Sequence, residues 1–135
     1  MLDKIKKNDL FCDYYLQWIN IYKKNSIRKI TMDKYLMSHK WLEKLVPNLK
    51  IHKLTRIAYQ QLINDYAIYH ERQTTMDFHH QLKGAILDAV DEGLIDRDPT
   101  RKVIILFCSP ITSRTFFVSF FNLSLYSIYT LIDLK

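Results

Sequence analysis

Apolar side chains in the first part of the chain recur at the spacing of amphipathic helices. Over residues 9–24 they stand three or four positions apart, so they line one side of a helix. The stripe consists of Leu10, Phe11, Tyr14, Tyr15, Trp18, Ile19 and Tyr22. Asn8 or Asp9 can accept a hydrogen bond from a backbone N–H of the first turn. The pattern therefore predicts a helix over residues 9–24, capped by one of these two side chains.

A second helix is predicted between Thr31 and Pro47. The Thr31 hydroxyl can cap the first turn, and the residue before a proline disfavours helical backbone. The inward-facing positions of this helix are Tyr35, Leu36, Leu42 and Leu45. Trp41 lies off this stripe, so we expect it either to cover a neighbouring side chain or to contact a ligand.

Two more helices complete the predicted bundle. The third begins after Thr55 and runs to about Arg72, with its stripe at Tyr59, Leu62, Ile63, Tyr66 and Ala67. The fourth begins at Thr74 or Thr75, with its stripe at Phe78, Leu82, Ala85, Ile86 and Ala89. It ends at Gly93, because glycine is favoured in the left-handed conformation that terminates helices. No strand-like alternation competes here, so the sequence predicts an all-α bundle of four helices.

The last part of the chain, residues 103–135, has a different composition. Its charged residues are Arg114, Asp133 and Lys135, and the rest is rich in Phe, Leu, Ile, Tyr, Ser and Thr without helical start and stop signals. Low charge with many aromatic and β-branched residues is typical of aggregation-prone or disordered segments. Residues 115–132 are uncharged and reach the roughly 17–18 residues needed to span a membrane. Six Thr, Ser or Asn side chains lower their hydrophobicity, which makes a tail anchor the weaker hypothesis.

Composition and charge narrow the possible functions. The 135 residues allow one ordinary domain, and only 2 Gly and 3 Pro argue against Gly-rich phosphate loops and turn-dense β folds. A net charge of +6 favours a polyanionic partner, with nucleic acid as the first candidate. Cys12 and Cys108 fit neither a metal motif nor a disulfide framework, and the N-terminus lacks the apolar core of a signal peptide. We therefore expect a cytoplasmic protein.

The sequence contains no recognisable catalytic or metal-binding motif. The five histidines have neither H-E-x-x-H nor Cys/His spacing, and His79 and His80 point about 100° apart on a helix. No Ser/His/Asp or Cys/His arrangement has motif support. We expect a protein without cofactor, metal or enzymatic activity.

Basic residues cluster at the ends and outward faces of the predicted helices. Lys23, Lys24, Arg28 and Lys29 crowd the first connection, Lys34, Lys40 and Lys44 lie off the stripe of the second helix, and Arg72, His79, His80 and Lys83 surround the fourth. Helix N-termini attract anions, so phosphate could also bind at Thr31 and at Thr74 or Thr75. The alternative, that these charges are simply solvated, stays open.

Two stretches carry a resemblance to a known family. Residues 74–100, TTMDFHHQLKGAILDAVDEGLIDRDPT, resemble the last helix of the core-binding domain of tyrosine recombinases, the phage integrase family. The matching features are Ala89 near the helix end, Gly93-Leu94-Ile95 at the turn, and Asp98-Pro99, where the family more often has Asn-Pro. The opening, FCDYYLQWINIYKKNSIRKITMDKYLMSHKWLEKL, is similar to the first two helices of integrases from mobile elements of Gram-positive bacteria. The resemblance covers residues 9–102.

The resemblance implies a four-helix SAM-like domain that grips one face of the attachment-site core in double-stranded DNA. In the family the second and fourth helices face the major groove. With the basic cluster at the second helix, this gives a candidate DNA-contact set of Arg28, Lys29, Thr31, Lys34, Lys40, Lys44, Thr74, Thr75, His79, His80 and Lys83. Contacts to phosphates and contacts to bases are not separated by the sequence.

The family's catalytic residues have no match in this chain. Two arginines, a lysine, histidines and the tyrosine nucleophile belong to a C-terminal domain, and no such motif follows residue 102. We expect a truncated integrase: an N-terminal extension over residues 1–8, a DNA-binding domain over 9–102 and an out-of-frame or disordered tail over 103–135. Other integrase subunits are possible partners. The competing hypotheses are a basic module that binds such a subunit or an acidic protein without touching DNA, and a tail-anchored membrane protein.

Overall fold

A computed structural model describes residues 5–105, which contain four α-helices. These are α1 (Phe11–Trp18), α2 (Lys29–Leu45), α3 (Arg56–Tyr69) and α4 (Arg72–Asp91). A π-helical turn, η1 (Ile19–Lys23), extends α1, and a short 3₁₀ turn, η2 (Ile51–Lys53), precedes α3. Within residues 5–105 the only β-type pairing is an antiparallel bridge between Leu10 and Lys50. The prediction of an all-α bundle is confirmed for this part of the chain.

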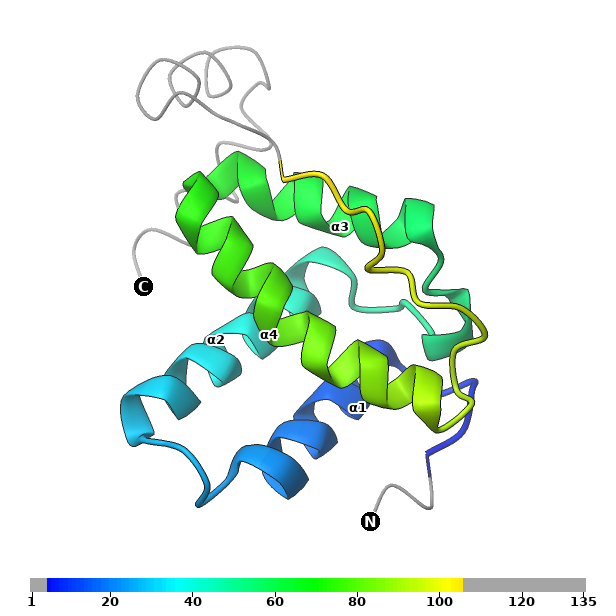
Figure 1. Cartoon of the computed structure of the whole chain (residues 1–135), viewed down its shortest axis with the longest axis horizontal. Helices are drawn as coiled ribbons and strands as arrows, with labels where there is room; N and C mark the ends of the chain where they lie inside the picture. The colour runs from blue at the N-terminus through cyan, green and yellow to red at the C-terminus, as the bar shows by residue number, and fades with distance from the viewer. Residues whose placement is uncertain (1–4, 106–135) are drawn as a thin grey trace.

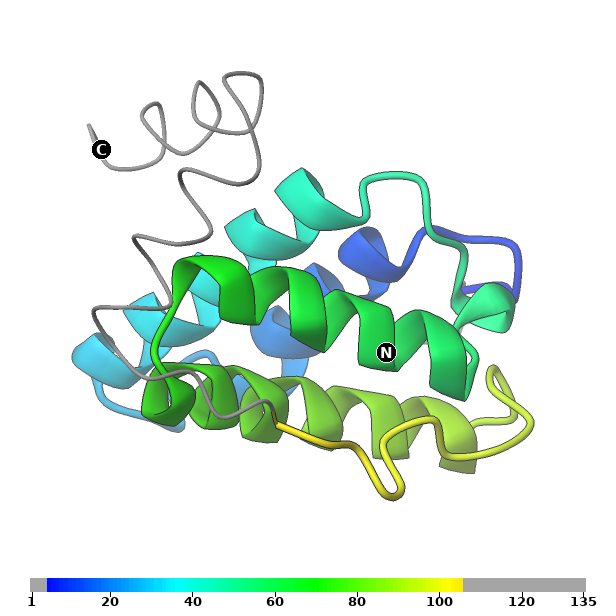
Figure 2. The ribbon, with the colours of Figure 1, turned by 90° about the horizontal axis from the view of Figure 1, so that it is seen from above.

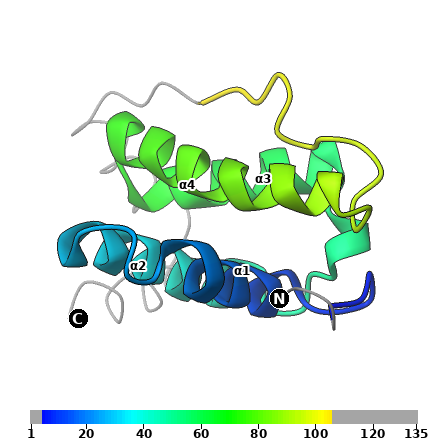
Figure 3. The ribbon, with the colours of Figure 1, turned by 60° about the horizontal axis from the view of Figure 1, so that its bottom comes forward.

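The helices form two layers. Figure 3 shows α1 and α2 in one layer and α3 and α4 in the other, and Figure 2 shows α3 lying along α4. Helix α4 contacts α1, α2 and α3, so it is central to the bundle (Figure 1). Each layer buries its apolar stripe against the other, which is how helical bundles remove such stripes from water.

The predicted stripes of the third and fourth helices are confirmed position by position. All five predicted residues of α3 and all five of α4 are buried. The rings of Tyr66 in α3 and Phe78 in α4 stack with centroids 3.8 Å apart. Two polar contacts join α1 to α4: the Tyr14 hydroxyl donates to the Ala85 carbonyl at 2.8 Å, and Trp18 Nε1 donates to Asp88 Oδ2 at 2.6 Å. The aromatic core is therefore fixed by directional bonds as well as by packing.

Three predicted N-terminal caps are wrong. Helix α1 follows Leu10, α2 follows Arg28 and α4 follows Glu71, and none of these three residues caps its helix through its side chain. Thr31 lies within the first turn of α2, where its N–H bonds to the Arg28 carbonyl. The Thr75 hydroxyl likewise donates back to the Glu71 carbonyl at 2.9 Å. Both threonines therefore lie inside a helix instead of preceding it. The bond from the Thr75 hydroxyl to the carbonyl four residues earlier is a known alternative to capping for Thr.

The cap predicted for the third helix is confirmed. Thr55 has extended backbone, and its hydroxyl oxygen accepts a hydrogen bond from the Ala58 N–H at 3.2 Å. The helix ends at Tyr69, three residues earlier than expected, because His70 adopts extended backbone and turns the chain into α4.

Tyr22 was expected in the buried stripe of the first helix but is 47% exposed. The turn after Trp18 is π-helical, with the Lys24 N–H bonded to the Ile19 carbonyl five residues earlier. This wider turn shifts the register of the residues that follow, so Tyr22 leaves the buried side.

The end of α4 forms as the sequence predicts. Gly93 has a positive φ of 78°. The Leu94 N–H bonds to the Ala89 carbonyl and the Gly93 N–H to the Val90 carbonyl, which is the Schellman arrangement. Asp98 Oδ1 then accepts from the Thr100 N–H at 2.8 Å, so aspartate serves the turn around Pro99. The chain continues along α3 toward residue 105 (Figure 1).

No helix within residues 5–105 is long and apolar enough to cross a membrane. The predicted anchor over 115–132 and the predictions for the rest of the tail beyond residue 105 lie outside the described residues.

Candidate nucleic-acid interface

A groove of about 220 Å³ opens where α2 meets α4. Helix α2 contributes Lys34, Met37 and Ser38, helix α4 contributes Thr74, Asp77, Phe78 and Gln81, and Tyr66 completes the lining. Ser38 Oγ hydrogen-bonds to Gln81 Oε1 and joins the two walls. The structure thus brings together two of the predicted contact residues, Lys34 and Thr74, from helices far apart in the sequence.

The lysines of α2 extend this surface beyond the groove. Lys34, Lys40 and Lys44 are all exposed. At about 100° per residue, Lys44 lies about 80° and Lys40 about 120° around the helix from Lys34. Met37 lies between them and is 52% exposed. One side of α2 therefore presents three cations around an exposed methionine, together with the exposed carboxylate of Asp33.

The start of α2 adds two more cations. Arg28 and Lys29 are exposed at the cap and first position of the helix, and Thr31 is half-buried in the first turn. The N-terminus of α2 is thus at Arg28 and Lys29, two residues before the predicted site, and it combines helix-dipole charge with two basic side chains.

The predicted contact residues of α4 do not share one face. Thr74 is exposed at the groove, but Lys83 lies nine residues later, which places it about 180° around the helix. His80 is exposed and lies about 120° from Thr74. Lys83 therefore faces away from the groove and does not share a surface with Thr74.

Thr75 and His79 are buried inside the bundle. Thr75 is 0% and His79 8% exposed, so neither has surface available for DNA. His79 Nδ1 lies 2.8 Å from the Tyr59 hydroxyl. Burial, with smaller effects of the nearby His80 and Lys83 side chains, lowers the pKa of His79 to about 4. The ring is therefore neutral at physiological pH and is a core hydrogen-bonding partner.

Trp41 is also part of the core. It is 5% exposed and packs edge-on against Tyr66 with ring centroids 5.5 Å apart. Lys44 Nζ lies 5.4 Å from the Trp41 ring centroid. The expectation that Trp41 covers a neighbour is confirmed, and the alternative of a ligand contact is wrong because α3 crosses α2 over this residue.

The cations of this surface are not neutralised within the domain. Among residues 5–105 Lys7 forms an ion pair with Asp96 at 3.6 Å, and His39 Nε2 lies 3.4 Å from a Glu43 carboxylate oxygen. None of the α2 lysines is in such a pair. Asp77 is the one carboxylate in the groove lining, and it accepts a hydrogen bond from Gln73 Nε2 at 3.1 Å. The sequence did not single out Met37, Asp77 or Gln81, because only the crossing of the two helices places them beside Lys34.

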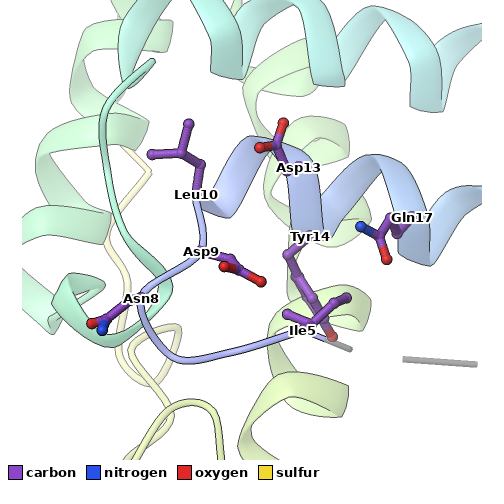
Figure 4. Close-up of a pocket in the computed structure, with 7 residues that line it drawn as sticks. All are labelled: Ile5, Asn8, Asp9, Leu10, Asp13, Tyr14 and Gln17. Atoms are coloured by element: carbon purple, nitrogen blue, oxygen red, sulfur yellow. The ribbon is translucent and has the colours of Figure 1, made fainter. Parts of the chain in front are cut away.

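A second cavity, of about 390 Å³, lies at the start of α1 and has the opposite character (Figure 4). Its lining includes Asp9, Asp13, Tyr14 and Gln17. The two carboxylates would repel phosphate, so this end of the molecule is a poor site for a nucleic acid. Within the described residues no group of three or more His, Cys, Asp or Glu side chains could hold a metal ion.

Four buried tyrosines of the domain are not activated as nucleophiles. Burial raises the pKa of Tyr14, Tyr15 and Tyr59, and raises that of Tyr66 to about 12. These phenols stay protonated at neutral pH. Tyr126 and Tyr129 lie outside the described residues.

Two solved structures share this fold. The N-terminal domain of an integrase, prophage pi2 protein 01 from Lactococcus lactis, matches with a TM-score of 0.70 and 28% identity over 75% of this chain and 95% of that domain. A fragment of a phage integrase from Staphylococcus saprophyticus matches in fold with a TM-score of 0.65 and 24% identity over 73% of this chain and 89% of that fragment. No protein-family model and no curated protein matches the chain. The described part of this chain therefore has the fold of the N-terminal domain of a phage integrase.

Proposed function

We propose that this domain binds double-stranded DNA through the face formed by α2 and the first half of α4. The observation that carries the proposal is the groove in which Lys34 and Thr74 meet, flanked by the unpaired cations Lys40 and Lys44. The likeness to phage integrase N-terminal domains supports the same role, with the core of an attachment site as the target.

The chemistry of this face suits a duplex. Lysines neutralise phosphates and release counterions, which supplies most of the affinity of weak, sequence-independent binding. The exposed thioether of Met37 and the polar ends of Thr74 and Gln81 offer apolar and hydrogen-bonding contacts of the kind that read base edges. Arg28 and Lys29 at the start of α2 are placed for a flanking phosphate.

The proposal is tested with charge reversals. Binding of a fluorescent duplex of arbitrary sequence would be measured at low salt for the wild type, Lys34→Glu and Lys40→Glu. Each is expected to weaken binding about tenfold, because a phosphate contact becomes a repulsion. Lys53→Glu, in η2 and away from the groove, is the matched control and should retain binding. Equal losses in all three variants, or no binding by the wild type at low salt, would contradict the proposed face.

We further propose that the chain binds DNA without cutting it. The matched structures are an N-terminal domain and a fragment of integrases. Burial raises the pKa of Tyr14, Tyr15 and Tyr59, so these phenols stay protonated. The chain should form no covalent protein–DNA adduct with nicked or supercoiled substrates. A denaturation-resistant adduct on a gel would overturn this second statement and leave the binding proposal intact.

A further inference from the structure

A second groove, of about 550 Å³, runs between α3 and the segment that follows α4. Its walls include Arg56, Ile57 and Gln60 from α3, and Arg101, Lys102 and Ile104 from the returning chain. This segment follows α3 (Figure 1) and lies on the side of the α3–α4 layer that is away from α1 and α2 (Figure 3). The groove shares no lining residue with the α2–α4 groove, so it requires its own explanation.

Two isoleucines in this groove lack apolar cover. Ile57 is 83% exposed and Ile104 is 65% exposed, whereas their neighbours Val103 and Ile105 pack against the core. A single exposed apolar side chain is ordinary on a protein surface. Two of them lining one groove from separate segments of chain indicate a surface that can bury apolar side chains of a ligand.

The charge of the groove has one sign. Arg56, Arg101 and Lys102 are exposed cations of the lining, and no carboxylate lines it. Within residues 5–105 none of the three forms an ion pair. A ligand that complements both properties carries acidic groups beside apolar side chains.

The groove is held in shape before any ligand arrives. The Gln60 side-chain amide donates to the Ile104 carbonyl at 2.8 Å and accepts from the Ile104 N–H at 2.9 Å. This paired contact fixes the returning segment against α3. A preformed groove loses little conformational entropy on binding.

We propose that this groove binds a segment of a partner protein in which acidic residues alternate with large apolar residues. DNA supplies the negative charge, but its thymine methyl groups lie in the major groove behind the phosphates. A peptide can place apolar side chains directly beside its carboxylates, so the observations favour a peptide for Ile57 and Ile104. The proposal concerns a different face from the proposed DNA surface and does not depend on it.

The first test is a selection with short random peptides displayed on phage. Peptides would be selected on the wild-type chain and counter-selected on a variant carrying Ile57→Ser, Ile104→Ser and Arg101→Glu. Enriched sequences are expected to combine Asp or Glu with Leu, Ile, Val or Phe. Enrichment of sequences without acidic residues, or no difference between wild type and variant, would overturn the proposal.

Titration of the best enriched peptide then tests the individual contacts. Ile57→Ser and Arg101→Glu should each weaken peptide binding about tenfold, equivalent to about 1.4 kcal/mol. Ile30→Ser changes a similarly exposed isoleucine, 68% exposed on α2, and should leave binding unchanged. Circular dichroism of each variant confirms that the bundle is folded.

Duplex DNA serves as the competing ligand. Duplex binding should be the same for Ile57→Ser and the wild type, and duplex should not displace the peptide. If Ile57→Ser and Arg101→Glu both weaken duplex binding while no peptide is enriched, the groove is part of a nucleic-acid surface and the proposal is wrong.

Discussion

His79 shows how one residue changes its role between sequence and structure. On the sequence it is one of two adjacent histidines on a basic helix, and therefore a candidate DNA contact. In the fold it is buried beside Tyr59, with the side chains of His80 and Lys83 and the carboxylate of Asp98 nearby. A neutral ring can accept a hydrogen bond from the Tyr59 hydroxyl at Nδ1, and protonation of Nδ1 would remove that acceptor.

The lowered pKa of His79 predicts a specific pH dependence of stability. The pKa is about 4 in the folded state and about 6.5 in the unfolded chain, so the unfolded chain binds the proton first as the pH falls. The stabilisation is fully present above pH 6.5 and is lost as the pH falls toward 4. Between pH 7 and pH 5 the free energy of unfolding should fall about 1–2 kcal/mol less in His79→Gln than in the wild type, measured by urea denaturation. Identical losses in both proteins would contradict a buried, neutral histidine.

Asp77 is the unfavourable charge in the lining of the α2–α4 groove. It lines the α2–α4 groove with Lys34 and accepts a hydrogen bond from Gln73, four residues earlier. Asp77→Asn keeps an oxygen for that bond and removes the charge. We expect Asp77→Asn to strengthen duplex binding about two- to fivefold at low salt, because one repulsion with phosphate is lost.

The chain offers a matched control for this change. Asp65 accepts a hydrogen bond from Gln61 at 2.9 Å, which repeats the same four-residue arrangement on α3. Asp65→Asn should leave duplex binding unchanged if the α2–α4 face is the interface. Equal strengthening by the two variants would show that only the net charge matters.

At the scale of elements, the contact between α1 and α4 depends on a small residue. A Cβ built on Gly84 would lie 3.3 Å from the Trp18 ring. The ring cannot move freely, because its Nε1 donates to Asp88 on the same helix as Gly84. Gly84 therefore allows the close approach of the two layers.

A pair of substitutions tests this contact. Gly84→Leu should destabilise the domain by about 1–3 kcal/mol through overpacking against Trp18. Gly84→Ala should be close to neutral, because the gain of about 1 kcal/mol in helix propensity offsets a small shift of the ring. Thermal unfolding of the two variants measures the difference, and equal stabilities would show that α1 and α4 have room to separate.

At the scale of the whole molecule, the net charge of +6 acts through its distribution. The acidic cavity at the start of α1 and the lysines of α2 lie on different parts of the bundle, so a polyanion is attracted to one side. Such binding is expected to depend strongly on salt.

The salt dependence of binding measures how many phosphates the protein neutralises. If Z phosphates are neutralised, log K should fall with log salt at a slope of about −0.9Z. Removing the charge in Lys40→Gln should reduce Z by about one, and Lys53→Gln should leave the slope unchanged. A wild-type affinity that does not respond to salt would contradict an electrostatic interface.

The sequence by itself determined the number of helices, their approximate extents and most of the buried stripes. Helical periodicity and the preference of glycine for positive φ are local properties, so the apolar positions of α3 and α4 and the end of α4 at Gly93 could be predicted. The family resemblance added the correct fold for the same reason, since it rested on this local pattern.

Only the tertiary structure decided which residues flanking the stripes are covered. Trp41 and His79 lie at stripe edges, and they are buried because α3 crosses over one and lies against the other. The groove beside Lys34 likewise exists only where two helices distant in sequence meet. Periodicity fixes the direction of a side chain on its own helix, whereas its burial depends on the position of a second helix, which no local pattern contains.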